Sequence, residues 1–336
     1  MLQQTTSLQS HPSDKNNRLE DIKALGIVEN YLVLSEIGEN HLYPVFLAFP
    51  LDSTSTSLSS LVVLKAIPVN DKKGSFVNEC GVFQLKPHRN ILKCIEIIQN
   101  VKLNFGDYKR DEYHLFVLPY LSNGDLLDFL RKTRFDERTA RFYFEQILDS
   151  VEHMHSQGLA HRDLKAENFL IGDDFEMVLA DFGHSVKFAD VVGPKMFSGS
   201  DAITSPGICP PEYYNGAGYK ATEMDVFALG KLLLILVTGL NPFKTTKATD
   251  QTFSLIANGN WQKYWSLTNG WMKKKWTRSE EFSPKFKELV EQMLNPNPKL
   301  RPTIQQIRES AWFTEIKPKS YEEVQATMVR SRMSLQ

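Results

Sequence analysis

The chain has 336 residues, of which 42% are hydrophobic and 24% are charged, so it is long enough to form two packed lobes. Its 39 basic and 40 acidic residues leave a net charge of −1, which excludes a global field that favours nucleic acid or an anionic membrane. Three cysteines are an odd number in a long chain, which argues against a secreted disulfide framework. We therefore expect a cytoplasmic protein with no nucleic-acid partner and no membrane partner. A monomer is the expectation for its oligomeric state, which the sequence leaves open.

The sequence predicts neither a signal peptide nor a membrane span. Residues 1–27 are mostly polar, with no basic stretch followed by an apolar one, and we expect a flexible tail there. The longest apolar run extends from Leu229 to Leu240 and includes Lys231. Because about 20 residues are needed to span a bilayer, this run predicts a buried helix in a large core.

Short strand-like runs dominate the first third of the chain. They are apolar and are separated by Gly, Pro or polar loops, which is typical of β-strands. The runs are Tyr31 to Glu36, Val45 to Phe49, Leu61 to Ile67, Cys94 to Gln99 and His114 to Leu118. One helix is predicted among them, around Phe76 to Leu85. This part of the sequence predicts a small β-rich lobe.

Helical patterns follow Asn123. One apolar stripe at helical spacing ends at Gly158, a residue suited to a helix C-terminus; its members are Phe144, Ile147, Leu148, Val151 and Met154. Ser283 and Pro284 predict the start of another helix, as N-cap and first-turn residue. A strand-rich part followed by a helical part indicates an α+β protein with two lobes and a ligand cleft between them.

Two motifs carry the chemistry: HRDLKAEN at residues 161–168 and DFG at residues 181–183. With them the chain resembles the eukaryotic protein kinase family from about Val28 to Phe313. The other family motifs occur in the same order, namely VVLKAI, E-x(8)-H-x-N-I, FVLPYLSNGDLLDFL, CPPE, DVFALG and KLRPT. Lys165, two residues after Asp163, resembles the serine/threonine subgroup, and GDLLDFL with RPTIQQIRESAWF resembles its calmodulin-dependent-kinase-like branch.

This resemblance implies a division of the chain. The kinase domain is expected at residues 28–313, with an N-lobe at 28–118, a hinge at 119–123 and a C-lobe at 124–313. The N-lobe holds the sheet and one main helix, and the C-lobe is mainly helical. Residues 314–336 are expected to form a C-terminal tail with no basic amphipathic helix, too short for an autoinhibitory module.

The resemblance also implies ATP and Mg²⁺ as cofactors, protein substrates, and four catalytic residues. Lys65 is expected to neutralise the α- and β-phosphates, and Glu79 to hold it by an ion pair. Asp163 is expected to orient the substrate hydroxyl and accept its proton, while Lys165 stabilises the transferring phosphoryl group. Positioning and electrostatics are most of the catalysis in phosphoryl transfer, so charged groups are what this chemistry needs.

The remaining expected site residues bind metal or nucleotide. Asn168 and Asp181 supply oxygen ligands suited to Mg²⁺. The residues expected around the nucleotide are Ile37, Gly38, Val45, Val63, Lys65, Leu118, Pro119, Leu121, Asp125 and Leu170.

The phosphate-covering loop departs from the family pattern G-x-G-x-x-G-x-V. Gly38 is followed by ENHLYPV, so Tyr43 adds a side chain and Pro44 removes an N–H donor where backbone would approach phosphate. This opens the alternative of a pseudokinase that acts as a nucleotide-binding or scaffold module. A small-molecule kinase is disfavoured by the CPPE element, and a different nucleotide-binding fold by the lack of GxxxxGK[ST].

Supporting roles follow from the same resemblance. Glu212 and Arg301 are expected to form a buried ion pair, and Asp225 to bind the backbone of the catalytic loop. Arg162 would pair with Asp201 without phosphorylation, with Ser200 as an alternative phosphosite.

A cluster of aromatic residues at 261–276 with Lys273 to Lys275 indicates either lobe packing or a docking surface.

Overall fold

The structure is a computed structural model, and it describes residues 24–38, 42–53, 58–108, 111–190, 193–194, 196–198, 206–216, 218–276 and 281–333. The chain forms two compact units. Of the described residues, those up to Asn70 and those within Cys94–Tyr120 form one unit, and those within Asp71–Lys93 and from Leu121 onward form the other. This division into a strand unit and a helical unit is the α+β class that the sequence predicts.

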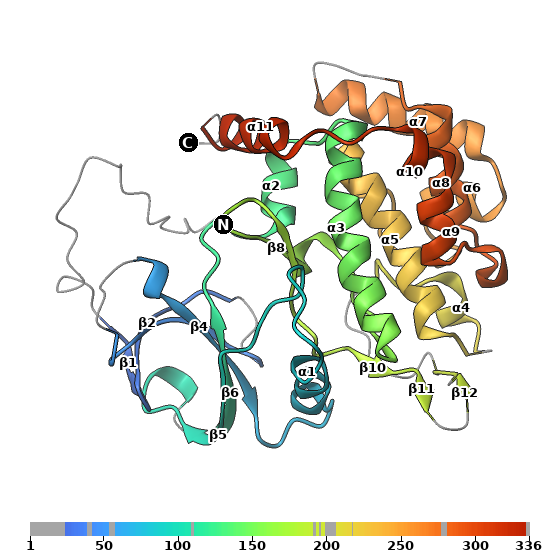
Figure 1. The fold of residues 1–336 in the computed structure, drawn as a ribbon. Coiled ribbons are helices and arrows are strands. Elements are labelled where there is room, and N and C mark those ends of the chain that lie inside the picture. Colours follow the sequence, from blue (N-terminus) through green and yellow to red (C-terminus); the bar gives the residue numbers. More distant parts are fainter. Residues whose placement is uncertain are drawn as a thin grey trace. The chain divides into compact units, whose positions relative to one another are not determined.

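The strand unit is one antiparallel sheet in the order β1-β2-β3-β4-β6-β5 (Figure 1). Its strands are β1 (Gly26–Val28), β2 (Tyr31–Glu36), β3 (Val45–Pro50), β4 (Val62–Pro68), β5 (Glu96–Lys102) and β6 (Glu112–Pro119). Two single-turn 3₁₀ helices, η2 (Leu58–Ser60) and η3 (Gly106–Tyr108), lie in its loops. All five strand-like runs of the sequence are found here.

The two faces of this sheet differ. One face carries the core of the unit, where Phe46 meets the rings of Phe105 and Tyr108 edge to face at 5.4 and 5.5 Å between centroids. Directly opposed residues of an antiparallel pair share a face, and the register opposes Val45 to Lys65. Lys65 therefore lies on the face opposite to Phe46, its side chain only half-buried.

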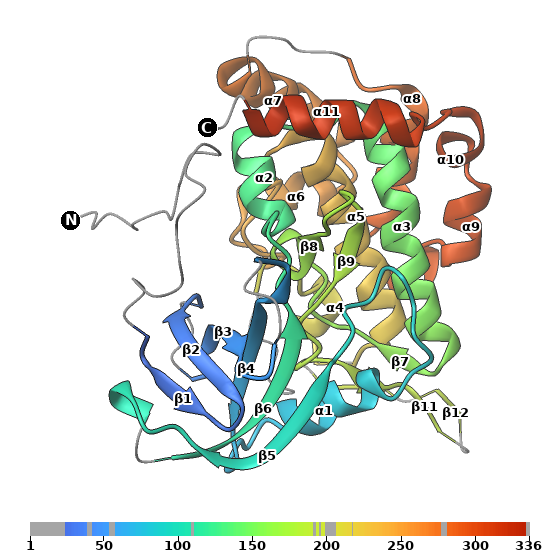
Figure 2. The same cartoon turned by 60° about the vertical axis from the view of Figure 1, so that its left-hand side comes forward.

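The helical unit contains eleven α-helices among its described residues (Figure 2). They are α1 (Ser75–Phe83), α2 (Leu126–Lys132), α3 (Glu137–Ser156), α4 (Pro211–Tyr214), α5 (Ala221–Thr238), α6 (Gln251–Ala257), α7 (Trp261–Lys275), α8 (Pro284–Met293), α9 (Ile304–Glu309), α10 (Ala311–Glu315) and α11 (Tyr321–Met333). Three two-stranded ribbons accompany them: β7 (Leu159–Ala160) with β10 (Val186–Lys187), β8 (Phe169–Ile171) with β9 (Met177–Leu179), and β11 (Ala189–Asp190) with β12 (Gly193–Pro194). Single 3₁₀ turns occur at η4 (Ala166–Asn168) and η5 (Pro298–Leu300).

Local signals place the helix ends. The side chain of Asp136 accepts a hydrogen bond from the Thr139 N–H and begins α3, and Gly158 follows α3 with a φ of +77°, which favours glycine. Ser283 caps α8 through the Phe286 N–H, and Pro284 occupies its first turn. The predicted starts and stops of these two helices are therefore confirmed.

Helix α5 is the central helix of this unit. It is buried along almost its whole length, as the apolar run predicts, and it packs against α3 and α8. A Cβ on Gly230 would lie 2.7 Å from the Cβ of Met293, so glycine permits the close approach of α8. Among the described residues, no helix combines the length and apolar character that crossing a membrane requires.

Two elements differ from the expected domain division. Helix α1, expected in the N-lobe, belongs to the helical unit. The C-terminal segment, expected to be a tail without a basic amphipathic helix, contains α11, whose Val324 and Met328 are buried. Figure 2 shows α11 lying across the ends of α2 and α3, where Lys319 bonds Asp136 at 2.6 Å. Two buried side chains are too weak a pattern for prediction from sequence alone.

Candidate active site

The segment that follows β7 is held by a buried carboxylate on α5. Asp225 accepts hydrogen bonds from the backbone N–H groups of His161 at 2.9 Å and Arg162 at 2.8 Å. Its Oδ2 also lies 2.8 Å from Nε2 of His155. Arg162 has a φ of +63°, which is uncommon for a side chain other than glycine, so these bonds hold a strained turn. The predicted role of Asp225 is confirmed.

The side chain of Asp163 points into a polar cluster formed by its own loop. Its Oδ2 contacts the ammonium group of Lys165 at 2.8 Å and the Nδ2 of Asn168 at 3.0 Å. Asn168 also bonds the backbone oxygen of Asp163 at 2.8 Å, so one amide group fixes both the loop and the carboxylate. Only 1% of Asp163 is exposed, and among the described residues its Oδ1 has no hydrogen-bond partner.

An unpaired oxygen on a buried carboxylate is unusual, because burial without a partner is unfavourable. Such an oxygen is suited to accept a hydrogen bond from a hydroxyl that reaches the loop from outside. The cluster therefore has the geometry of a general base with one oxygen fixed and one available.

Asp181 follows the ribbon of β8 and β9. Phe169 pairs with Leu179 in this ribbon, and the Ala180 N–H bonds the backbone oxygen of Asn168 at 2.8 Å, so the two loops that carry Asn168 and Asp181 run together. Asp181 is exposed and has a φ of +58°. A strained backbone at an exposed carboxylate is typical of a functional position.

The two residues after Asp181 are anchored to α1. Phe182 is fully buried, with its ring edge to face against Phe83 of α1 at 5.6 Å and against His161 at 5.7 Å. Asn78 of α1 donates from Nδ2 to the Gly183 oxygen at 2.8 Å. These contacts explain why α1 groups with the helical unit.

Glu79 of α1 faces this anchored segment. It is 1% exposed, and its Oε1 lies 3.4 Å from the point where a Cβ on Gly183 would be. Asp181 Oδ1 lies 3.7 Å from the same point, so glycine here allows two carboxylates to approach one backbone position.

The arrangement fits a magnesium ion. Mg²⁺ is bound in proteins by one or two carboxylates together with phosphate oxygens, more often than by an all-protein cage. Asp181 offers one carboxylate, and Asn168 uses its Nδ2 for Asp163, so the amide oxygen is the atom of that side chain suited to ligate a cation. Among the described residues, no group of three or more His, Cys, Asp or Glu side chains could hold a metal ion.

The expected nucleotide residues divide between the two units. In the strand unit, Val63 is opposed to Leu118 and lies two residues from Lys65, so all three share the face that carries Val45. Ile37 lies on the loop just before this face and donates its N–H to the Val45 oxygen at 2.8 Å. Gly38 and Pro119 are also in this unit.

Leu121, Asp125 and Leu170 belong to the helical unit. Asp125 forms a β-bridge with Leu170, so these two expected nucleotide contacts are neighbours. The Asp125 carboxylate also caps α2 by accepting a hydrogen bond from the Asp128 N–H at 2.9 Å. An Asp directly before a helix is a pattern from which this capping role can be predicted. Burial raises the pKa of Asp125 above its ordinary value.

The predicted ion pair between Glu212 and Arg301 is confirmed. Both side chains are buried, and the guanidinium contacts the two carboxylate oxygens at 2.5 and 2.7 Å. This pair joins α4 to the turn after η5. The predicted contact of Arg162 with Asp201, and the candidate phosphosite Ser200, involve positions outside the described residues. Arg162 itself bonds the His184 oxygen at 2.8 Å.

Three side chains that support the site are absent from the sequence prediction. His155 and Asn78 act through partners 70 and 105 residues away, so no local pattern identifies them. His161 lies inside the HRD motif, but the motif alone does not show that its ring packs against Phe182. Burial also lowers the pKa of His161, which favours a neutral ring.

A family model described as "Protein kinase domain" matches residues 45–313. CBL-interacting protein kinase 26 of Oryza sativa subsp. japonica is 27% identical over 289 residues, which cover 85% of this chain and 52% of that protein. The carbon catabolite-derepressing protein kinase of Candida glabrata is 28% identical over 305 residues, 90% of this chain and 44% of that protein. For 3-phosphoinositide-dependent protein kinase B of Dictyostelium discoideum, the identity is 31% over 265 residues, 78% of this chain and 26% of that protein. The chain thus spans about half of these relatives or less.

Proposed function

The chain belongs to the protein kinase family, and from this premise we propose that it transfers the γ-phosphoryl group of ATP to serine and threonine hydroxyls of proteins, with Mg²⁺. The names of its relatives support the reaction class. Lys165, two residues after Asp163, supports the hydroxyl class. We also propose that it works in the cytoplasm, which the small, odd number of cysteines supports, and that it is a monomer.

Each residue of the cluster has one task in this reaction. Asp163 accepts a hydrogen bond from the substrate hydroxyl through Oδ1 and takes its proton as the new oxygen–phosphorus bond forms, while the bond from phosphorus to the β-phosphate oxygen of ATP breaks and ADP leaves. Lys165, whose ammonium group lies 2.8 Å from Oδ2, places a positive charge beside the transferring group. Asn168 fixes the loop through the Asp163 backbone oxygen, so the carboxylate does not reorient during the step.

Asp181 and Asn168 are the residues that would hold the metal, with the amide oxygen and the carboxylate as ligands. The bound Mg²⁺ neutralises charge on the phosphates and so stabilises the transition state. Lys65 would bind the phosphates from the strand unit, and Glu79, buried on α1, would hold it there. Val45, Val63 and Leu118 would contact the adenine ring from their shared face of the sheet.

One observation carries this proposal: Asp163 is buried, is held by a lysine and an amide, and has one oxygen without a partner among the described residues. Most buried polar side-chain atoms have a hydrogen-bond partner, so a buried carboxylate oxygen without one is suited to accept a hydrogen bond from a substrate.

The test compares the full chain with its Asp163→Asn variant for transfer of labelled phosphate from ATP to generic protein substrates. Loss of the general base is expected to lower kcat by about 10²- to 10⁴-fold while ATP binding, measured by titration, persists. Asp149→Asn is the matched control, because Asp149 also pairs with a cation, Arg308 at 2.5 Å, on the same unit. This control is expected to keep the wild-type kcat.

The acceptor and the metal are tested in the same assay. Hydrolysis of the labelled products should release phosphoserine and phosphothreonine, and removal of Mg²⁺ with a chelator should stop transfer. A wild-type chain that binds ATP and transfers no phosphate would refute the enzyme and select the scaffold role.

A further inference from the structure

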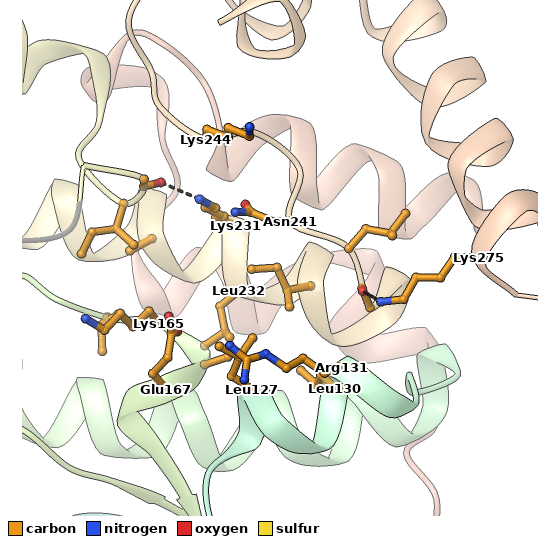
Figure 3. Close-up of a pocket in the computed structure, with 18 residues that line it drawn as sticks. Leu127, Leu130, Arg131, Lys165, Glu167, Lys231, Leu232, Asn241, Lys244 and Lys275 are labelled. Carbon is orange, nitrogen blue, oxygen red and sulfur yellow. Dashed lines mark hydrogen bonds between the residues drawn. The ribbon is translucent and has the colours of Figure 1, made fainter. Parts of the chain in front are cut away.

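A cavity of about 500 Å³ lies beside the proposed catalytic loop, within the helical unit (Figure 3). Leu164, Lys165 and Glu167 of that loop line one end of it. Since Lys165 also lies 2.8 Å from Asp163, the cavity begins next to the group proposed to receive the substrate hydroxyl. A protein segment that presents its hydroxyl to Asp163 therefore has neighbouring residues within reach of this cavity.

The lining is strongly basic. Five cationic side chains contribute to it and only one carboxylate, that of Glu167, does so; the cations are Arg131, Lys165, Lys231, Lys244 and Lys275. Two of them are neutralised by nearby carboxylates: Arg131 bonds Asp128 at 2.7 Å, and Lys165 bonds Asp163.

The other three lysines have no carboxylate partner among the described residues. Lys231 is 5% exposed and donates to two backbone oxygens, those of Gly207 at 2.6 Å and Phe243 at 3.1 Å. Lys275 donates to the Gly239 oxygen at 2.5 Å. Lys244 is exposed at the same cavity.

The nearest other carboxylate does not change this balance. Asp250 accepts hydrogen bonds from the backbone N–H groups of residues 244, 245, 252 and 253, and it does not line the cavity. In Figure 3, Glu167 lies at the end nearest Lys165, and Lys231, Asn241 and Lys244 lie along the other side. Three ammonium groups thus oppose one exposed carboxylate.

We propose that this cavity, named here the basic pocket, binds an acidic residue of the protein substrate, phosphorylated or not, close to the acceptor hydroxyl. The inference rests on the proposed function and names its substrate class: serine or threonine residues with an Asp, a Glu or a phosphorylated residue nearby. Lys244 and Lys275 would contact the anion, and Lys231 would supply a fixed positive charge beneath it. Leu127 and Leu232 give the pocket apolar walls for the stem of the side chain.

The test uses the full chain and a peptide series with one acceptor serine, in which each flanking position in turn carries Asp, phosphoserine, Asn or Lys. Wild-type protein is expected to show a kcat/KM about tenfold higher with an acid than with Asn at one or two positions, as a charge-assisted contact near the surface provides. The preference should weaken as salt is raised, because surface charges are screened.

Variants connect the preference to the pocket. The double variant Lys244→Gln/Lys275→Gln should bring the ratio of acidic to neutral peptide close to one. Its matched control, Lys274→Gln, removes an exposed lysine from the same helix outside the pocket and should keep the ratio. Charge reversal, Lys244→Glu/Lys275→Glu, should favour the Lys peptides, a gain that misfolding does not imitate.

Binding of the same peptides, measured by fluorescence anisotropy, separates this inference from the proposed function. A chain that phosphorylates nothing but binds acidic peptides more tightly through Lys244 and Lys275 would refute the kinase and support the pocket. Equal affinity for acidic and neutral peptides, tighter binding of the Lys peptides, or an acid preference that survives in the double variant would overturn the inference.

Discussion

Lys231 is a positive charge inside an almost fully buried helix, and its replacement by methionine is the most demanding test of this structure. The side chain is 5% exposed and, among the described residues, donates to two backbone oxygens, those of Gly207 and Phe243. Burial lowers the pKa of Lys231 from 10.5 to about 8. Methionine has a similar length and no charge, so Lys231→Met removes the titration and keeps most of the volume.

The pKa shift sets the magnitude. Between pH 8 and pH 10.5 the unfolded chain keeps a proton on Lys231 that the folded chain has released, so the free energy of unfolding rises with pH in this window. At about 1.4 kcal/mol for each pKa unit, the whole effect is about 3 kcal/mol, of which about 2.5 kcal/mol develops between pH 7 and pH 10. Lys231→Met lacks this contribution.

Denaturant unfolding of the wild type and of Lys231→Met from pH 7 to pH 10 measures this contribution to the free energy of unfolding. The difference in unfolding free energy, wild type minus variant, should increase by about 2.5 kcal/mol, and other titrating groups cancel in that difference. Lys274→Met, at an exposed lysine, is the control, and its unfolding free energy should change with pH in parallel with that of the wild type. Parallel curves for wild type and Lys231→Met would refute the burial of a charged lysine.

Two further predictions concern the helical unit. Glu212→Gln leaves the Arg301 guanidinium buried without its carboxylate and should lower the free energy of unfolding by about 3–5 kcal/mol in a denaturant titration; a loss below about 1 kcal/mol would contradict a buried pair. Val324→Asp places a charge in the buried side of α11 and should abolish hydrogen-exchange protection of that helix while α3 stays protected. The matched control is Gln325→Asp at the next residue, which lies at the partly exposed side and should keep the protection, whereas equal protection in both variants would mean that α11 does not dock through Val324.

Much of the fold follows from local pattern. Helix ends are set by residues within one turn of the end, so a few residues suffice to predict them. Ser283 and Pro284 start α8 in this way, and Gly158 follows the end of α3. The cluster of Asp163, Lys165 and Asn168 is predicted through the motif that resembles the protein kinase family. Its three members lie within six residues and touch one another, so the motif alone brings them together.

Contacts between segments that are distant in sequence cannot be predicted from such local patterns. Asn78 and Gly183 are 105 residues apart, and their hydrogen bond depends on how α1 packs. The basic pocket is a stronger example, because Arg131 and Lys275 line one cavity although 144 residues separate them. Lysines at 273–275 suggest a docking surface from sequence, but only the fold distinguishes Lys275, which lines the pocket, from its two neighbours.

The buried charge and the basic pocket depend on the same side chain. An apolar residue would suit α5 better than Lys231, since a charge in this position lowers stability at neutral pH. A Cβ on Gly207 would lie 3.1 Å from the Lys231 ammonium and 3.1 Å from the Lys244 backbone oxygen, so glycine lets the segment before α4 rest directly on the lysine. Lys231 thus fixes the backbone that borders the pocket and also supplies its deepest positive charge.

This dual role separates two kinds of variant. If a destabilising charge is retained because substrates need it, Lys231→Met should lose the pH dependence of stability and the preference for acidic peptides together. Lys244→Gln/Lys275→Gln should lose the preference alone, because neither lysine is deeply buried. Loss of the pH dependence with an unchanged preference in Lys231→Met would mean that the buried charge serves only to hold the Gly207 backbone.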